Sequence, residues 1–141
     1  MQVAFSISVY LSAAPEEVYN AWLRSNRHTE MTGSKAKIGA ETGTDFSAQD
    51  GYISGRNLLL LPPNHIVQSW RTKSFAAGDS DSQVEISLLP ENDGTKLILL
   101  HSNIPKGQPD YKQWWSEHYF VPMEAYFAKM MIPVPAMPEP F

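Results

Sequence analysis

Residues 110–130 read DYKQWWSEHYFVPMEAYFAKM and form the longest helical candidate in the chain. The large apolar side chains recur there at i, i+3 and i+4 spacing, at Trp115, Tyr119, Pro122, Met123, Tyr126 and Met130. A stripe of this width needs a broad apolar cover, and the strands predicted upstream are the only large candidate for it. Pro122 cannot donate a helical hydrogen bond, so we predict a kink near His118.

The segment between residues 35 and 101 is predicted to form a run of antiparallel strands. Turn-forming residues divide it at three places, Gln49-Asp50-Gly51, Pro62-Pro63-Asn64 and Glu91-Asn92-Asp93-Gly94. Within residues 83–89 the apolar Val84, Ile86 and Leu88 alternate with more polar positions, which indicates a strand with one covered face. Residues 97–100 are apolar at every position, which indicates a strand that is central in the sheet or covered on both faces.

The N-terminal part is predicted to hold one strand and two short helices. Residues 3–11 place their apolar side chains mainly on one side, as a half-buried strand does. Pro15 favours the start of a first helix, and Ser25 is the expected cap of a second helix over 26–31 that ends at Thr32-Gly33. The complete order is one strand, two short helices, six further antiparallel strands and one long helix. This order indicates an α+β fold in which a curved antiparallel sheet wraps around the C-terminal helix.

The composition is that of one folded domain. The 141 residues fit a single domain over 1–131 followed by a proline-rich tail over 132–141. Prolines keep the tail extended, and we expect its apolar side chains to pack across a homodimer. The absence of cysteine excludes disulfides, thiolate nucleophiles and cysteine-based metal sites.

Charge and hydropathy exclude further classes of partner. The formal net charge is −4 and no block of Lys or Arg occurs, so we expect no nucleic-acid partner and no membrane partner. No segment approaches the ~20 apolar residues of a membrane span, and the N-terminus lacks the pattern of a signal peptide. We therefore expect a cytoplasmic protein.

No motif in the sequence points to a catalytic or metal site. The four histidines lack the paired spacing of zinc sites, and no catalytic-triad order or phosphate-binding loop is visible. We expect His101 and His118 to approach each other, with structural hydrogen bonding favoured over acid–base catalysis. Arg56 and Arg71 fit an anion-binding role or, as we favour, ion pairs on the outer face of the sheet. The sequence thus predicts no enzyme, no catalytic residue, no metal and no cofactor.

Several segments resemble the C-terminal domain of the activator of heat-shock protein 90 ATPase homologue family. The most specific are DGYISGRN at 50–57 and IVQSWR at 66–71; the others are Thr32-Gly33, Leu61-Pro62, GTKL at 94–97, Ile104-Pro105, Trp114 and YFVPM at 119–123. The resemblance runs from Phe5 to Lys129. It implies the START-like helix-grip fold, shared with polyketide cyclases and plant pathogenesis-related allergens, with a cavity between the sheet and the C-terminal helix.

The resemblance implies a non-enzymatic protein that binds an apolar or amphipathic small molecule, or a lipid, in that cavity. The residues expected to line it are Trp22, Met31, Phe46, Trp70, Leu99, Trp115, Tyr119 and Met123, with the polar Arg56, Arg71, His101 and His118 at its rim. The alternative for the lining residues is ordinary core packing. The alternative functions are a co-chaperone-like module that contacts a heat-shock protein 90 homologue and, less favoured, a cyclase-like enzyme.

Overall fold

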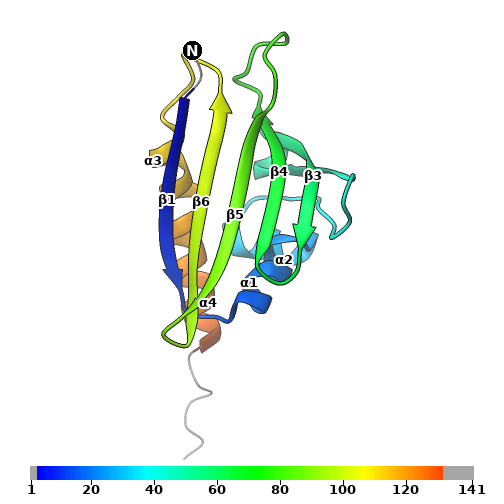
Figure 1. The fold of residues 1–141 in the computed structure, drawn as a ribbon. Helices are drawn as coiled ribbons and strands as arrows, with labels where there is room; N and C mark the ends of the chain where they lie inside the picture. Colours follow the sequence, from blue (N-terminus) through cyan, green and yellow to red (C-terminus); the bar gives the residue numbers. More distant parts are fainter. Residues whose placement is uncertain (1–2, 132–141) are drawn as a thin grey trace, which may run out of the picture.

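A computed structural model describes residues 3–131, which form a six-stranded antiparallel sheet with helices α1 to α4 behind it (Figure 1). The strand order across the sheet is β1-β6-β5-β4-β3-β2. The strands are β1 (Val3–Leu11), β2 (Asp45–Ala48), β3 (Ile53–Leu61), β4 (His65–Thr72), β5 (Ser82–Glu91) and β6 (Gly94–Ile104). The helices are α1 (Pro15–Trp22), α2 (Ser25–Thr32), α3 (Tyr111–Trp115) and α4 (Val121–Met131), with short helical turns at Gln49–Gly51 and Ser116–Phe120. The extended tail predicted over 132–141, and the homodimer contact expected of it, lie outside the described residues.

The predicted α+β helix-grip architecture is confirmed, with one strand fewer than expected. Five strands instead of six follow α2. The segment 33–44 meets β2 only through a single bridge between Lys37 and Ser47. The next pair of this ladder would join Gly39 to Asp45, but the Gly39 carbonyl accepts from Asn57 Nδ2 (2.9 Å) instead, so no seventh strand forms.

Ser25 is not the N-cap of α2, contrary to prediction. Helix α2 begins at Ser25 and follows Arg24, which makes no side-chain cap hydrogen bond. The Ser25 hydroxyl accepts from the Ile38 N–H (2.9 Å) and donates to the Ile38 carbonyl (3.1 Å). The helix ends as predicted at Gly33, whose φ of 80° is the left-handed conformation that favours glycine.

One face of the sheet carries the core. In β5, Val84, Ile86 and Leu88 are buried and alternate with more exposed positions, as predicted. Strand β6 lies between β1 and β5, which confirms the prediction of a central strand for residues 97–100. Leu100 is nevertheless 40% exposed, because the outer face of this strand has no covering layer among residues 3–131.

The C-terminal helix changes its hydrogen-bond register where Pro122 interrupts it. Residues Ser116–Phe120 form a π-helical turn between α3 and α4, and the Val121 N–H donates to the Ser116 carbonyl, five residues back. Pro122 has no N–H for the His118 carbonyl, and its ring crowds that carbonyl. A wider turn relieves the crowding, so the irregularity predicted near His118 takes the form of a π-helical turn.

Gly55 provides a test of how closely β3 packs against its neighbours. Its register partners are Phe46 in β2 and Trp70 in β4. A Cβ atom at this position would overlap the Ser69 carbonyl oxygen and lie 2.7 Å from Phe46 Cε1. We expect Gly55→Ala to lower the free energy of unfolding by about 1–3 kcal/mol in urea denaturation. Gly78→Ala is the control: its Cβ meets no atom within 4 Å, so a change of similar size there would contradict the steric explanation.

Candidate functional site

The eight predicted cavity-lining residues all lie in the interior between the sheet and the helices, where they are buried. Trp115 is at the centre of the cluster. Its ring centroid lies 4.8 Å from Tyr119, 5.5 Å from Trp70 and 6.2 Å from Trp22. Side chains thus fill the space around Trp115, and ligand binding at this position stays a prediction.

His101 lies in this interior and not at a rim, which corrects the prediction. It is 0% exposed and belongs to a continuous chain of hydrogen bonds. Trp115 Nε1–H donates to His101 Nδ1 (3.0 Å), so the proton of the neutral ring is on Nε2, which donates to Ser82 Oγ (2.8 Å). Ser82 Oγ donates to the Trp70 carbonyl (2.8 Å). Burial lowers the pKa of His101 to about 3, so the imidazole is neutral near pH 7.

His28 is a second buried imidazole, which the sequence did not single out as an interior group. Its Nδ1–H donates to the Trp22 carbonyl (2.7 Å), so Nε2 accepts from the Tyr119 hydroxyl (2.8 Å). Burial lowers the pKa of His28 to about 4, against the opposing effect of the hydrogen bond to Trp22. Burial also raises the pKa of the Tyr119 hydroxyl, so both partners are neutral.

A ladder of buried amides joins this interior to the surface loop that precedes β2. Trp22 Nε1–H donates to Gln68 Oε1 (3.3 Å), and Gln68 Nε2 donates to Asn57 Oδ1 (2.8 Å). Asn57 Nδ2 then donates to the carbonyls of Gly39 (2.9 Å) and Glu41 (3.2 Å). Sequence reasoning missed Gln68, although a polar residue between the inward-facing Ile66 and Trp70 of a strand is a signal of a buried polar group.

The other predicted rim residues lie on the surface and do not surround one opening. Arg56 Nε bonds to Asp45 (2.9 Å) across β2 and β3, as the favoured ion-pair interpretation predicted. Arg71 bonds to Asp81 (2.7 Å) and donates to the Asp79 and Ala76 carbonyls, so it holds the loop between β4 and β5. His118 is exposed and stacks on Trp114 with ring centroids 4.9 Å apart. It does not share the buried position of His101, so the expected pairing of the two histidines is wrong.

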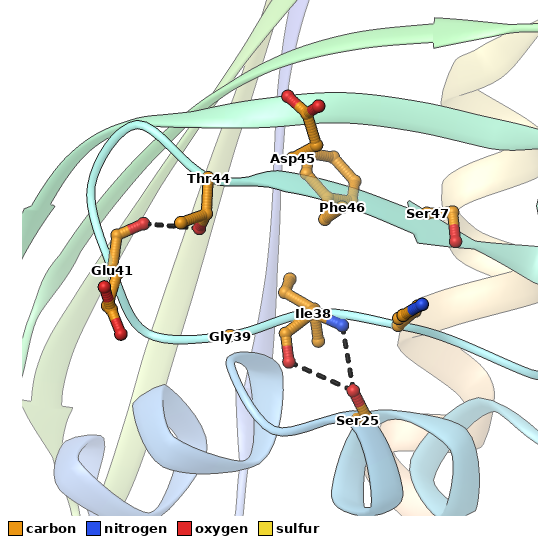
Figure 2. Close-up of a pocket in the computed structure, with 9 residues that line it drawn as sticks. Ser25, Ile38, Gly39, Glu41, Thr44, Asp45, Phe46 and Ser47 are labelled. Atoms are coloured by element: carbon orange, nitrogen blue, oxygen red, sulfur yellow. Dashed lines mark hydrogen bonds between the residues drawn. The ribbon is translucent and has the colours of Figure 1, made fainter.

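A surface pocket of about 560 Å³ opens between the segment 37–44, helix α2 and strand β2 (Figure 2). The side chains of Ile38 and Phe46 point toward each other across it, and both are mostly buried. The Asp45 carboxylate points away from the pocket, on the side of its partner Arg56. Phe46 is the one predicted cavity residue that lines this pocket. Its volume is in the range of ligand pockets.

The two buried imidazoles are engaged in hydrogen bonds within the protein. Both ring nitrogens of His28 and of His101 are engaged with protein groups, so neither imidazole has a free nitrogen for a substrate proton. Residues 3–131 contain no group of three or more His, Asp or Glu side chains placed to hold a metal ion. None of the helices in this part of the chain is long and apolar enough to cross a bilayer.

Comparison with known proteins identifies relatives over most of the chain. The family model described as Activator of Hsp90 ATPase homolog 1-like protein matches residues 12–128. The human Activator of 90 kDa heat shock protein ATPase homolog 1 is 30% identical over 108 residues, which cover 76% of this chain and 32% of the human protein. A Dictyostelium discoideum homologue of the same activator is 30% identical over 93 residues, 65% of this chain and 24% of that protein. The chain therefore spans about a third of the length of these relatives, or less.

Solved structures share the fold. An HSP90 activator from Plasmodium falciparum superposes with a TM-score of 0.79 and 25% identity, over 89% of this chain and 96% of that one. The Aha1 dimer from Colwellia psychrerythraea gives a TM-score of 0.73 at 14% identity, over 92% of this chain and 97% of that one, and shows the fold alone. The resemblance predicted from DGYISGRN and IVQSWR is confirmed by these matches.

Proposed function

Because the chain belongs to the family of Activator of Hsp90 ATPase homolog 1-like proteins, we propose that it is a non-enzymatic, cytoplasmic interaction module that binds a homologue of heat-shock protein 90. Relatives named as activators of this chaperone support the class of partner. The packed interior supports a protein partner over an internal ligand, because aromatic rings occupy the space that a ligand would need. The engaged ring nitrogens of the two buried histidines support a binding role over a catalytic one.

The open outer face of the sheet is the observation that carries this proposal. In Figure 1 this face is turned toward the viewer, and the four labelled helices lie behind it. The strand register places Leu59, Leu61 and Leu100 on this face, where they are 43%, 50% and 40% exposed. Exposed apolar side chains on a face that no other element covers can supply the apolar centre of a protein-binding surface.

Polar and charged side chains lie among these leucines. His65 Nε2 lies 3.0 Å from a Glu85 carboxylate oxygen. These two residues are in β4 and β5, which lie between β3, with Leu59 and Leu61, and β6, with Leu100. A shallow hollow of about 550 Å³ on this face is lined by residues that include Arg56 and Arg71. Partly exposed ion pairs add little to folding stability, and their charges remain available to orient a partner.

Binding of the fluorescently labelled chain to a purified heat-shock protein 90 homologue, followed by anisotropy, tests the proposal. We expect saturable binding and a loss of at least about tenfold in affinity for the double variant Leu59→Glu/Leu61→Glu, because carboxylates replace apolar contacts. Val121→Glu is the matched control, since Val121 is 59% exposed on α4, behind the sheet. Thermal unfolding verifies that each variant is folded. The absence of binding, or a double variant that binds as tightly as the unmodified chain, overturns the proposal.

A further inference from the structure

Strand β2 is an edge strand whose pairing with the preceding segment stops after one step. Lys37 and Ser47 each donate a backbone N–H to the other's carbonyl, at 2.9 Å in both cases. A continuing antiparallel ladder would next join Gly39 to Asp45 in the same way. The Gly39 carbonyl instead accepts from Asn57 Nδ2 (2.9 Å), and residues 3–131 show no backbone hydrogen bond between Gly39 and Asp45. Asn57 therefore holds the loop away from the edge of the sheet.

This separation leaves the backbone of Asp45 open toward the pocket. Alternate residues of a strand direct their N–H and C=O groups to the same side. Ser47 directs its groups to Lys37, so Asp45, two residues earlier, directs its own groups to the same side, away from β3. Within the described residues we find no partner for the Asp45 N–H or carbonyl on that side. An unpaired edge of this kind is a template for another strand.

The pocket supplies side-chain contacts next to this open backbone. Ile38 and Phe46 form an apolar floor, and their side chains face each other in Figure 2. Glu41 and Lys37 are exposed at opposite ends, Glu41 beside Thr44 and Lys37 beside Ser47. Neither has an ion-pair partner within 4 Å in the described part of the chain. The pocket therefore combines a backbone edge, an apolar floor and one charge of each sign.

We propose that this pocket binds an extended segment of a partner protein, which adds to β2 as an antiparallel strand beside Asp45. An apolar side chain of that segment packs over Ile38 and Phe46. Because the segment runs antiparallel to β2, an acidic residue precedes the apolar one and lies near Lys37, and a basic residue follows it and lies near Glu41. Main-chain hydrogen bonds supply affinity in this mode of recognition, and alternate side chains supply specificity. The site goes beyond the proposed function, because it does not depend on the chaperone or on the outer face of the sheet.

A fluorescein-labelled peptide, Thr-Glu-Val-Leu-Val-Lys-Thr, is the probe for this site, because it places an acidic residue before its Leu and a basic residue after it, in the order that the antiparallel orientation requires. We expect saturable binding in anisotropy titrations and, in two-dimensional ¹H–¹⁵N NMR spectra, shifts centred on the Asp45 amide with slower hydrogen exchange there. A peptide N-methylated at the two Val residues and Leu should bind about tenfold more weakly, because it lacks the main-chain donors.

Charge reversal tests the orientation of the segment. Glu41→Lys should weaken binding of the probe about fivefold, and a second peptide with Glu in place of its Lys should recover that loss. Glu117→Lys, an exposed change in the π-helical turn, is the control and should leave binding unchanged. No binding up to about 1 mM, or shifts that exclude Asp45, overturns the proposal. Equal binding of the N-methylated peptide also overturns it, because the pocket then takes an apolar ligand through side chains alone.

Discussion

Replacing Trp115 by alanine is expected to lower the free energy of unfolding by about 3–5 kcal/mol. The indole is fully buried, and the aromatic rings around it cannot collapse into the space that it leaves. The substitution also removes the N–H donor to His101 Nδ1 and leaves a buried acceptor without a partner. Urea denaturation followed by far-UV circular dichroism measures the loss. Trp70→Ala should cost a similar amount, because Trp70 is equally enclosed.

The remaining tryptophan on α3 provides the control for this prediction. Trp114 is only partly buried and stacks on the exposed His118. We expect Trp114→Ala to cost about 1–2 kcal/mol. Trp115→Phe separates packing from hydrogen bonding, since it keeps a ring and loses the donor. If Trp115→Ala and Trp114→Ala cost the same, the interior is not the closely packed cluster that the ring distances describe.

Acidification from pH 7 to pH 4 is expected to destabilise the fold through His28 and His101. Their pKa values in the folded chain are about 4 and about 3, lowered mainly by burial, whereas an unfolded histidine titrates near pH 6.5. The unfolded chain therefore holds up to two more protons than the folded chain below pH 6.5. Their contribution to stability is fully present above that pH and falls by about 1.4 kcal/mol per pH unit for each imidazole as the pH drops toward 4.

Urea midpoints measured at intervals from pH 7 to pH 4.5 test this dependence. His101→Gln preserves an acceptor for Trp115 and a donor for Ser82, but glutamine does not titrate. This variant should therefore remove about half of the histidine contribution to the slope of unfolding free energy against pH. His118→Gln is the matched control, because it makes the same substitution at an exposed position. A slope that neither variant alters would show that other groups cause the acid sensitivity.

Local periodicity was sufficient to identify most of the fold. The alternation around Ile86 and the first part of the helical stripe, at Trp115, identified buried faces, since repeats of 2.0 and 3.6 residues place side chains on one side of a strand or helix. The end of the stripe was wrong: Met130 is 50% exposed, and Phe127 is fully buried instead. Pro122 located the irregular turn, because a missing N–H acts on its own helix. The prediction of a seventh strand was wrong, because the Gly39 carbonyl bonds to Asn57, on β3, instead of continuing the pairing with β2.

The hydrogen-bond partners in the candidate sites could not be predicted in this way. His28 meets Tyr119 across 91 positions, and Asn57 reaches the Gly39 carbonyl across 18. No local pattern encodes such pairs, because hydrogen-bond partners, tautomers and lowered pKa values arise only when separate elements pack together. The spacing of apolar and aromatic residues along the chain thus determined most of the buried faces. The open edge at Asp45, in contrast, exists because tertiary contacts hold the neighbouring loop away from it.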